Sequence, residues 1–178
     1  DKKNNPKNKI DLKSLIKNSL EILKEFNRLP HRFQDLGERL NIRFINDSKS
    51  TNIHSTISAL DSISKKYGKN RTILLCGGDT KGQDLEQLLK IPKNVVKKII
   101  IFGKDKKLFI NELKKVIKFE SFTDLKFLIE KIFLDMDKNK KHKNILFSPA
   151  AASFDSFKNF EERGKYFNNL IKKFSHVK

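Results

Sequence analysis

Short apolar runs alternate with helical patterns along this chain, and the alternation restricts the possible folds more than any other feature. Five apolar runs are typical of strands, at 43–45, 72–76, 95–102, 118–122 and 144–147. Between and after them, apolar residues recur at helical spacing over 53–63, 85–89, 108–117, 125–136 and 157–174. This order predicts an α/β fold, with a mostly parallel sheet and helices on both of its faces.

The first thirty residues follow a different pattern. Residues 1–9 are polar, and from Ile10 to Phe26 the apolar residues fit one amphipathic helix, which Pro30 ends. The next segment, 32–43, fits either a pair of strands or a loop.

Ligands of parallel α/β sheets bind at the carboxyl ends of the strands. Three loops rich in polar or small residues follow apolar runs in this chain, at 46–51, 77–83 and 148–155. Four of the seven glycines also follow such runs, namely Gly77, Gly78, Gly82 and Gly103. We therefore expect a binding site where these loops meet.

The first of these loops leads into the helical pattern over 53–63. A helix that starts near Ser50 or Thr51 would have a hydroxyl cap, and its free backbone N–H groups would lie above the end of the strand. The junction therefore predicts a contact with a ligand.

The glycine-containing loop 77–83 does not match the common phosphate-binding motifs. Gln83 and Asp84 stand where the Walker motif requires Lys and Ser or Thr, and the chain has no Gly-x-Gly-x-x-Gly. The loop fits either a turn that presents Lys81 to a ligand or a plain turn with a solvated lysine. Asp84 and Gln87 are spaced for a capping box of the next helix.

Ser153, in the last loop, also has two interpretations. Near the start of the final helix, its hydroxyl could hold a carboxylate, or it could belong to a simple helix cap. A nucleophilic role is disfavoured, because no Gly-x-Ser-x-Gly surrounds this serine.

Composition and charge disfavour several classes of protein. The 178 residues include one cysteine, so no internal disulfide can form and a reducing, cytoplasmic compartment is expected. No apolar run approaches the roughly 20 residues of a membrane span, so no membrane partner is expected. The four histidines lack the spacing of metal ligands. The net charge of +18 is spread over nearly every segment, which favours a solvated surface over a nucleic-acid footprint.

Taken together, four motifs resemble the C-terminal domain of the Mur ligases. They are Leu29-Pro-His-Arg-Phe33, Asn46-Asp-Ser-Lys-Ser-Thr-Asn52, Gly77-Gly-Asp-Thr-Lys-Gly82 and Ser148-Pro-Ala-Ala-Ala-Ser-Phe-Asp-Ser-Phe-Lys-Asn-Phe-Glu-Glu-Arg-Gly164. The last motif is the most specific for the members that add D-glutamate, and the resemblance covers residues 29–174 in order. Two departures are small: Ser50 stands where the family usually has Ala, and Ala151 where it often has Cys.

The resemblance implies a Rossmann-like domain over 30–178, preceded at 1–29 by a disordered start and the final helix of a central ATPase domain. It implies an ATP-dependent ligase of peptidoglycan synthesis, which joins D-glutamate to UDP-N-acetylmuramoyl-L-alanine through an acyl phosphate. ATP and Mg²⁺ would be held mainly by the central domain. Because the central and N-terminal domains are needed as partners, the resemblance implies that this chain is inactive alone.

Residue roles are carried over by motif. Arg32, Asp47 and Lys49 would face the nucleotide. Four residues would bind D-glutamate, namely Thr51, Lys81, Ser153 and Phe160. A dicarboxylate suits a lysine together with hydroxyl or backbone donors, and the Asp47 carboxylate suits a ribose diol. No catalytic residue and no metal ligand is expected within this chain.

Two alternatives stay open. One is a stand-alone basic α/β module that binds nucleic acid or an acidic partner through its lysines. The other is a related Mur ligase or folylpolyglutamate synthase domain, which would take a different amino acid.

Overall fold

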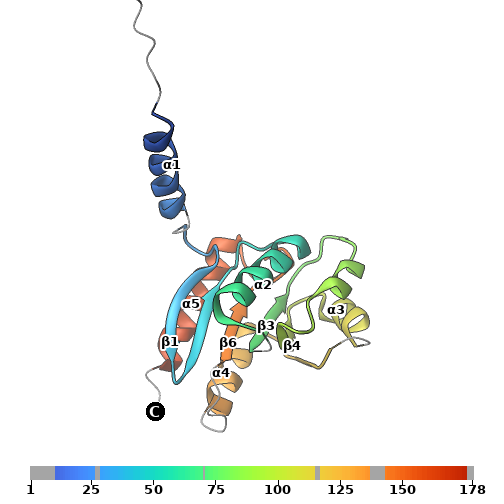
Figure 1. Ribbon diagram of the computed structural model, residues 1–178. Coiled ribbons are helices and arrows are strands. Elements are labelled where there is room, and N and C mark those ends of the chain that lie inside the picture. Colours follow the sequence, from blue (N-terminus) through green and yellow to red (C-terminus); the bar gives the residue numbers. More distant parts are fainter. Residues whose placement is uncertain (1–10, 27–28, 70, 115–116, 137–142, 176–178) are drawn as a thin grey trace, which may run out of the picture.

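The computed structural model describes residues 11–26, 29–69, 71–114, 117–136 and 143–175 (Figure 1). Within these residues, six strands form one sheet in the order β1-β2-β6-β3-β4-β5. Their bounds are β1 Gln34–Arg39, β2 Ile42–Asn46, β3 Thr72–Gly77, β4 Val96–Phe102, β5 Phe119–Ser121 and β6 Lys143–Phe147. Strands β2 to β6 pair in parallel, so the predicted α/β fold with a mostly parallel sheet is confirmed.

The segment that fitted either two strands or a loop is an edge hairpin. β1 pairs with β2 in the antiparallel sense, and Leu40 and Asn41 connect the two strands. Both connecting residues have positive φ angles, 49° and 62°, as the tight turns that match the twist of a hairpin require. A leucine at such a position gives no sequence signal for this turn.

Helices cover both faces of the sheet, as predicted. On one face lie α2 (Ile53–Tyr67), the 3₁₀ helix η1 (Glu86–Lys90) and α3 (Lys106–Leu113). On the other face lie α4 (Leu125–Met136) and α5 (Phe160–Ser175). Each layer buries its own apolar cluster against the sheet.

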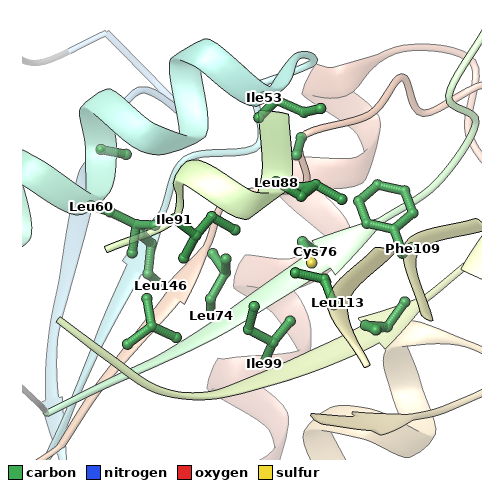
Figure 2. Close-up of a cluster of buried hydrophobic side chains, with 14 of the residues drawn as sticks. Ile53, Leu60, Leu74, Cys76, Leu88, Ile91, Ile99, Phe109, Leu113 and Leu146 are labelled. Atoms are coloured by element: carbon green, nitrogen blue, oxygen red, sulfur yellow. The ribbon is translucent and has the colours of Figure 1, made fainter. Parts of the chain in front are cut away.

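Figure 2 shows the cluster under α2, η1 and α3. Its sheet side comes from Leu74 and Cys76 of β3, Ile99 of β4 and Leu146 of β6, all fully buried. Its helical side includes Leu60, Leu88, Phe109 and Leu113. Burial of each large apolar side chain stabilises the fold by about 1.5–3 kcal/mol. Cys76 is a core residue, as expected, and its burial raises the pKa of the thiol.

Stacked aromatic rings hold α4 and α5 on the opposite face. The rings of Phe147 in β6 and Phe167 in α5 lie 4.3 Å apart between centroids, and those of Phe44 in β2 and Phe133 in α4 lie 5.5 Å apart. Such pairs add about 0.5–1.5 kcal/mol beyond the area that they bury. They fix the position of α5, and therefore of the loop that leads into it.

The sequence predicts the short element after β3 less well. The expected helix at 85–89 is η1, with Leu85 at its N-cap position. Asp84 instead accepts a hydrogen bond at 2.9 Å from the backbone N–H of Glu86, two residues on. The capping box expected from Asp84 and Gln87 is therefore not formed.

The predicted N-terminal helix is α1 (Leu12–Phe26), which extends away from the sheet in Figure 1. Its apolar residues are largely exposed, with Leu12 at 71% and Ile22 at 60%. An amphipathic helix with an exposed apolar face lacks the packing that normally stabilises such a helix. Among the described residues, no helix combines the length and apolar character needed to cross a bilayer.

Candidate functional site

The sheet order explains why the three predicted loops meet. β6 lies between β2 and β3, so the loop after β6 runs between the other two. The backbone N–H of Ala150 donates to Ser50 O at 3.0 Å, which ties the last loop to the first. Asp79 and Ala152 exchange backbone hydrogen bonds of 3.1 and 2.9 Å, which tie the last loop to the second. The expected meeting of the loops at the carboxyl ends of the strands is confirmed.

Asp47 is the centre of the first junction. One carboxylate oxygen accepts from the Ser50 hydroxyl and, at 2.9 Å, from the Ser148 hydroxyl, and the other accepts from Phe33 N at 3.0 Å. The residue is only 7% exposed. Burial raises the pKa of this carboxyl group, while these hydrogen bonds and the nearby Arg32 oppose the shift. Asp47 thus joins segment 29–33 to the loops after β2 and β6.

The cap of α2 differs from the prediction. The N-cap residue is Asn52, whose side-chain oxygen accepts from Ser55 N at 2.9 Å. The expected hydroxyl cap from Ser50 or Thr51 is wrong, because residues 47–51 form tight turns before the helix begins. In these turns Ser50 N donates to Asp47 O at 2.9 Å, and Thr51 N donates to Lys49 O at 2.8 Å.

The three residues predicted to face a nucleotide share one groove. Arg32, Asp47 and Lys49 line a cavity of about 670 Å³, together with Leu29, Phe33, Ser50, Ser55, Ser58, Ala59 and Ser62. This volume lies within the usual range for small-molecule sites. Arg32 is exposed, so its guanidinium can reach an anion in the groove. Each Asp47 oxygen is already hydrogen-bonded, but carboxylate oxygens can each accept more than one bond.

Phe160, predicted to bind the amino acid, lies beside the first loop. It is the first residue of α5, and its carbonyl accepts from Ser48 Oγ at 2.9 Å. The Lys49 ammonium lies 3.9 Å from the centroid of the Phe160 ring. Lys49 and Phe160 were assigned to different ligands, so this contact shows that the two predicted sets of residues adjoin.

The remaining predicted residues differ in accessibility. Lys81 is exposed at the tip of its loop, Thr51 is half-buried, and Ser153 is 2% exposed. Lys81 lies two residues after Asp79, and Ser153 directly follows Ala152. The bridge between Asp79 and Ala152 therefore brings the loops of Lys81 and Ser153 together. Ser153 does not lie at the start of the final helix as expected. α5 begins seven residues later, and Ser153 O accepts from the N–H groups of Ser156 and Phe157 in a turn.

Arg163 is a central residue to which sequence reasoning gave no role. It is fully buried, and its guanidinium donates to Ser48 Oγ, Ser48 O and Ala151 O at 2.9–3.0 Å. Burial lowers the pKa of Arg163 to about 10, and the charge of Asp155 opposes the shift. Its only signal in the sequence is its place in the motif that ends at Gly164.

Gly78 lets the second loop approach these groups. Its φ of +136° favours glycine, and an added Cβ would lie 2.4 Å from Ala152 O and 3.3 Å from Nη1 of Arg163. The backbone at Gly78 therefore packs directly against the last loop. Of the four glycines that follow apolar runs, Gly77 and Gly103 are packed as closely as Gly78, whereas an added Cβ at Gly82 would meet no atom within 4 Å.

Comparisons with known proteins agree with this arrangement. Residues 31–150 match the family described as Mur ligase, glutamate ligase domain. The chain is 43% identical over 166 residues to UDP-N-acetylmuramoylalanine--D-glutamate ligase of Buchnera aphidicola subsp. Baizongia pistaciae, covering 93% of this chain and 36% of that protein. It is 35% identical over 156 residues to the ligase of the same name from Cytophaga hutchinsonii, covering 88% of this chain and 33% of that protein.

Solved structures support the fold. A murein peptide ligase from Psychrobacter arcticus superposes with a TM-score of 0.62 at 11% identity, over 83% of this chain and 30% of that one. Folylpolyglutamate synthase from Thermotoga maritima gives 0.53 at 16% identity, over 85% of this chain and 32% of that one.

The chain spans about a third of the length of the curated relatives described above. The match to the glutamate ligase domain covers more than half of the chain, and the loops that carry three of the four motifs meet at one edge of the sheet. The chain therefore belongs to the Mur ligase family.

Proposed function

We propose that this chain is the amino-acid-binding domain of an ATP-dependent ligase that joins D-glutamate to UDP-N-acetylmuramoyl-L-alanine in peptidoglycan synthesis, in the cytoplasm. The observation that carries the proposal is the 35–43% identity to ligases named for D-glutamate, over 86% or more of the chain. In this reaction the muramoyl-alanine carboxylate is activated as an acyl phosphate. The amine of D-glutamate then attacks the acyl carbon, phosphate leaves, and the amine loses a proton.

D-glutamate carries two carboxylates, and the candidate residues suit them. Lys81 offers an exposed ammonium, Ser153 offers a hydroxyl on the loop beside it, and Thr51 offers a hydroxyl on the loop beyond. Phe160 supplies an apolar surface next to the first loop. Charged hydrogen bonds to carboxylates are among the strongest in proteins, so Lys81 should dominate the affinity. Holding the amine in a fixed position against the acyl phosphate is the contribution of this domain to the rate.

The groove beside this site fits a nucleotide. Arg32 can contact a phosphate, Asp47 can accept from a ribose hydroxyl, and Lys49 lies between the groove and Phe160. Bound ATP would supply the phosphoryl group. As the family resemblance implies, Mg²⁺ would be held mainly by the central domain of the ligase.

The proposal divides the chain at residue 29. Residues 1–29, with α1, belong with a preceding central ATPase domain, and 30–178 form the C-terminal domain. The exposed apolar residues of α1 support this division, because they need a surface to pack on. The N-terminal and central domains are then required partners, and the isolated chain is inactive.

The test measures kinetics of the complete ligase with Lys81→Ala. We expect a KM for D-glutamate at least tenfold higher, because a charged hydrogen bond contributes about 1.5–3 kcal/mol. The KM for ATP should change little. The control is Lys126→Ala, which removes an exposed lysine from α4 on the opposite face of the sheet.

The outcomes separate the alternatives. Equal effects of the two lysine variants, or use of L-glutamate in place of D-glutamate, would contradict the proposal. Turnover of ATP and D-glutamate by the isolated chain would contradict its dependence on the other domains. Binding of DNA that weakens steeply with salt would favour the nucleic-acid alternative.

A further inference from the structure

The ammonium group of Lys81 packs on an aromatic ring. Nζ lies 4.2 Å from the centroid of the Phe154 ring, within the range of a cation–π contact. Among the described residues, Lys81 forms no ion pair, although Asp79 is only two residues away. One Asp79 oxygen accepts from the backbone N–H of Lys81 at 2.9 Å, and the other lies 3.8 Å from Nζ of Lys104.

Phe154 is not accounted for by packing of the core. It is 58% exposed, although the adjacent Ser153 and Ala152 are almost fully buried. Burial of a phenylalanine normally stabilises a fold, so an exposed one on a loop contributes little to folding. Its position follows from the bridge between Asp79 and Ala152, which sets the loop of Lys81 beside the loop of Phe154.

A ring and a carboxylate would have different effects on this lysine. A carboxylate partner would neutralise the ammonium and compete with an acidic substrate. A ring attracts the cation through its face and leaves N–H groups free to donate to a carboxylate. A lysine side chain also has about 2 kcal/mol of rotamer entropy to lose on binding, and a contact formed beforehand reduces that loss.

We propose that Phe154 is a positioning residue for the amino-acid substrate, whose ring holds the Lys81 ammonium where loops 77–83 and 148–155 lie side by side. The inference rests on the proposed function, in which Lys81 binds a carboxylate of D-glutamate. It adds a residue that determines the affinity for that substrate without itself donating to it.

The test compares Phe154→Leu and Phe154→Tyr in the complete ligase. Leucine keeps an apolar side chain and removes the ring face, whereas tyrosine keeps the face. Because the attraction at an exposed site amounts to about a two- to fivefold factor in an equilibrium constant, Phe154→Leu should raise the KM for D-glutamate by that factor. The kcat and the KM for ATP should not change, and Phe154→Tyr should behave as wild type.

Phe127→Leu is the matched control. Phe127 is 54% exposed on α4, and Lys126 Nζ lies 6.0 Å from its ring centroid. Phe127→Leu is therefore the same substitution, beside a lysine as at Phe154, but on the opposite face of the sheet.

A second measurement is independent of turnover. The ε-methylene protons of Lys81 should show an upfield NMR shift from the ring current, which Phe154→Leu should remove.

Each kinetic result leads to one conclusion. If Phe154→Leu leaves the KM for D-glutamate unchanged while Lys81→Ala raises it, the inference is overturned and the proposed function stands. If Phe154→Leu raises the KM for ATP as much as that for D-glutamate, the ring has only a general structural role. If Lys81→Ala itself leaves the KM unchanged, the proposed function fails, and the inference fails with it.

Discussion

Arg163 of α5 contacts Ser48 of the first loop twice, donating from Nε to the serine Oγ at 3.0 Å and from Nη2 to the serine carbonyl at 2.9 Å. A third bond, from Nη1, reaches Ala151 O at 3.0 Å in the last loop. Among the described residues, Arg163 has no carboxylate within ion-pair distance, so these oxygen atoms stabilise its buried charge. One side chain therefore holds the loops after β2 and β6 together.

Arg163→Met should lower the free energy of unfolding by about 3 kcal/mol. The substitution has a similar length but leaves three buried acceptors without a donor, and each unsatisfied group costs about 1–3 kcal/mol with incomplete additivity. Urea unfolding measures the difference. The control is Lys165→Met, since Lys165 is exposed on the same helix and should have little effect. Equal losses in both variants would show that the three bonds contribute nothing.

Gly164→Ala should destabilise the domain even though alanine is the better helix former by about 1 kcal/mol. An added Cβ would lie 2.4 Å from Cγ and Nδ1 of the His31 ring, which is itself 4% exposed and cannot move into open space. Overpacking of this kind costs about 1–3 kcal/mol, so the steric effect exceeds the helix propensity. Because His31 precedes Arg32, the KM for ATP of the complete ligase should also rise.

The matched control for Gly164→Ala is Asn169→Ala. Asn169 is exposed in the same helix, so alanine there improves helix propensity without a new contact. We expect Asn169→Ala to keep or slightly raise the unfolding midpoint, and Gly164→Ala to lower it. A higher midpoint for Gly164→Ala would mean that the His31 ring moves at no cost.

The mostly parallel α/β sheet, and the loops that meet at the carboxyl ends of its strands, were predictable from the sequence for physical reasons. Strands buried on both faces are continuous apolar runs, as at Ile99–Phe102, and helices with one buried face show a period of 3.6, as in α4. Ligand-binding loops follow such strands, so the ends of the apolar runs predict where these loops lie. The fold alone did not supply residue roles, which came from motif resemblance.

The features that the sequence failed to predict depend on contacts between distant residues. Ser50 and Thr51 were the expected caps of α2, but the chain turns over 47–51, where the Ser50 hydroxyl bonds to Asp47, and Asn52 becomes the cap. The burial of Arg163 depends on Ser48 and Ala151, which lie 115 and 12 residues away. The edge hairpin depends on Leu40 accepting a positive φ. No local sequence pattern indicates these contacts or this turn.

Thr51→Val tests the role of a hydroxyl that the structure separates from the helix cap. Valine keeps the shape of threonine, and Asn52 still caps α2, so the free energy of unfolding should stay within about 0.5 kcal/mol of wild type. In the complete ligase the KM for D-glutamate should rise about three- to tenfold, because one hydrogen bond contributes about 0.5–1.5 kcal/mol. An unchanged KM would remove Thr51 from the substrate site.

Histidine 31 should make the domain less stable in mild acid. Nδ1 of its buried ring lies 3.1 Å from Nδ2 of Asn46, and the orientation of that amide is fixed because its oxygen accepts from Ser48 N. Nδ1 therefore faces an N–H group, and a proton on Nδ1 would set two donors against each other. Burial lowers the pKa of His31 from 6.5; Glu161 opposes the shift and Lys165 adds to it.

The sign of the pH dependence follows from proton binding. Below pH 6.5 the unfolded chain binds a proton at this residue that the folded chain resists, so stability is present above 6.5 and is lost as the pH falls through that value. Urea unfolding between pH 5 and 8 should show a loss of up to about 1.4 kcal/mol per pH unit from this group. His31→Asn should reduce that slope, since asparagine does not titrate and tolerates the φ of +63°. His54→Asn, at an exposed position on α2, is the control, and equal slopes in wild type and His31→Asn would refute the prediction.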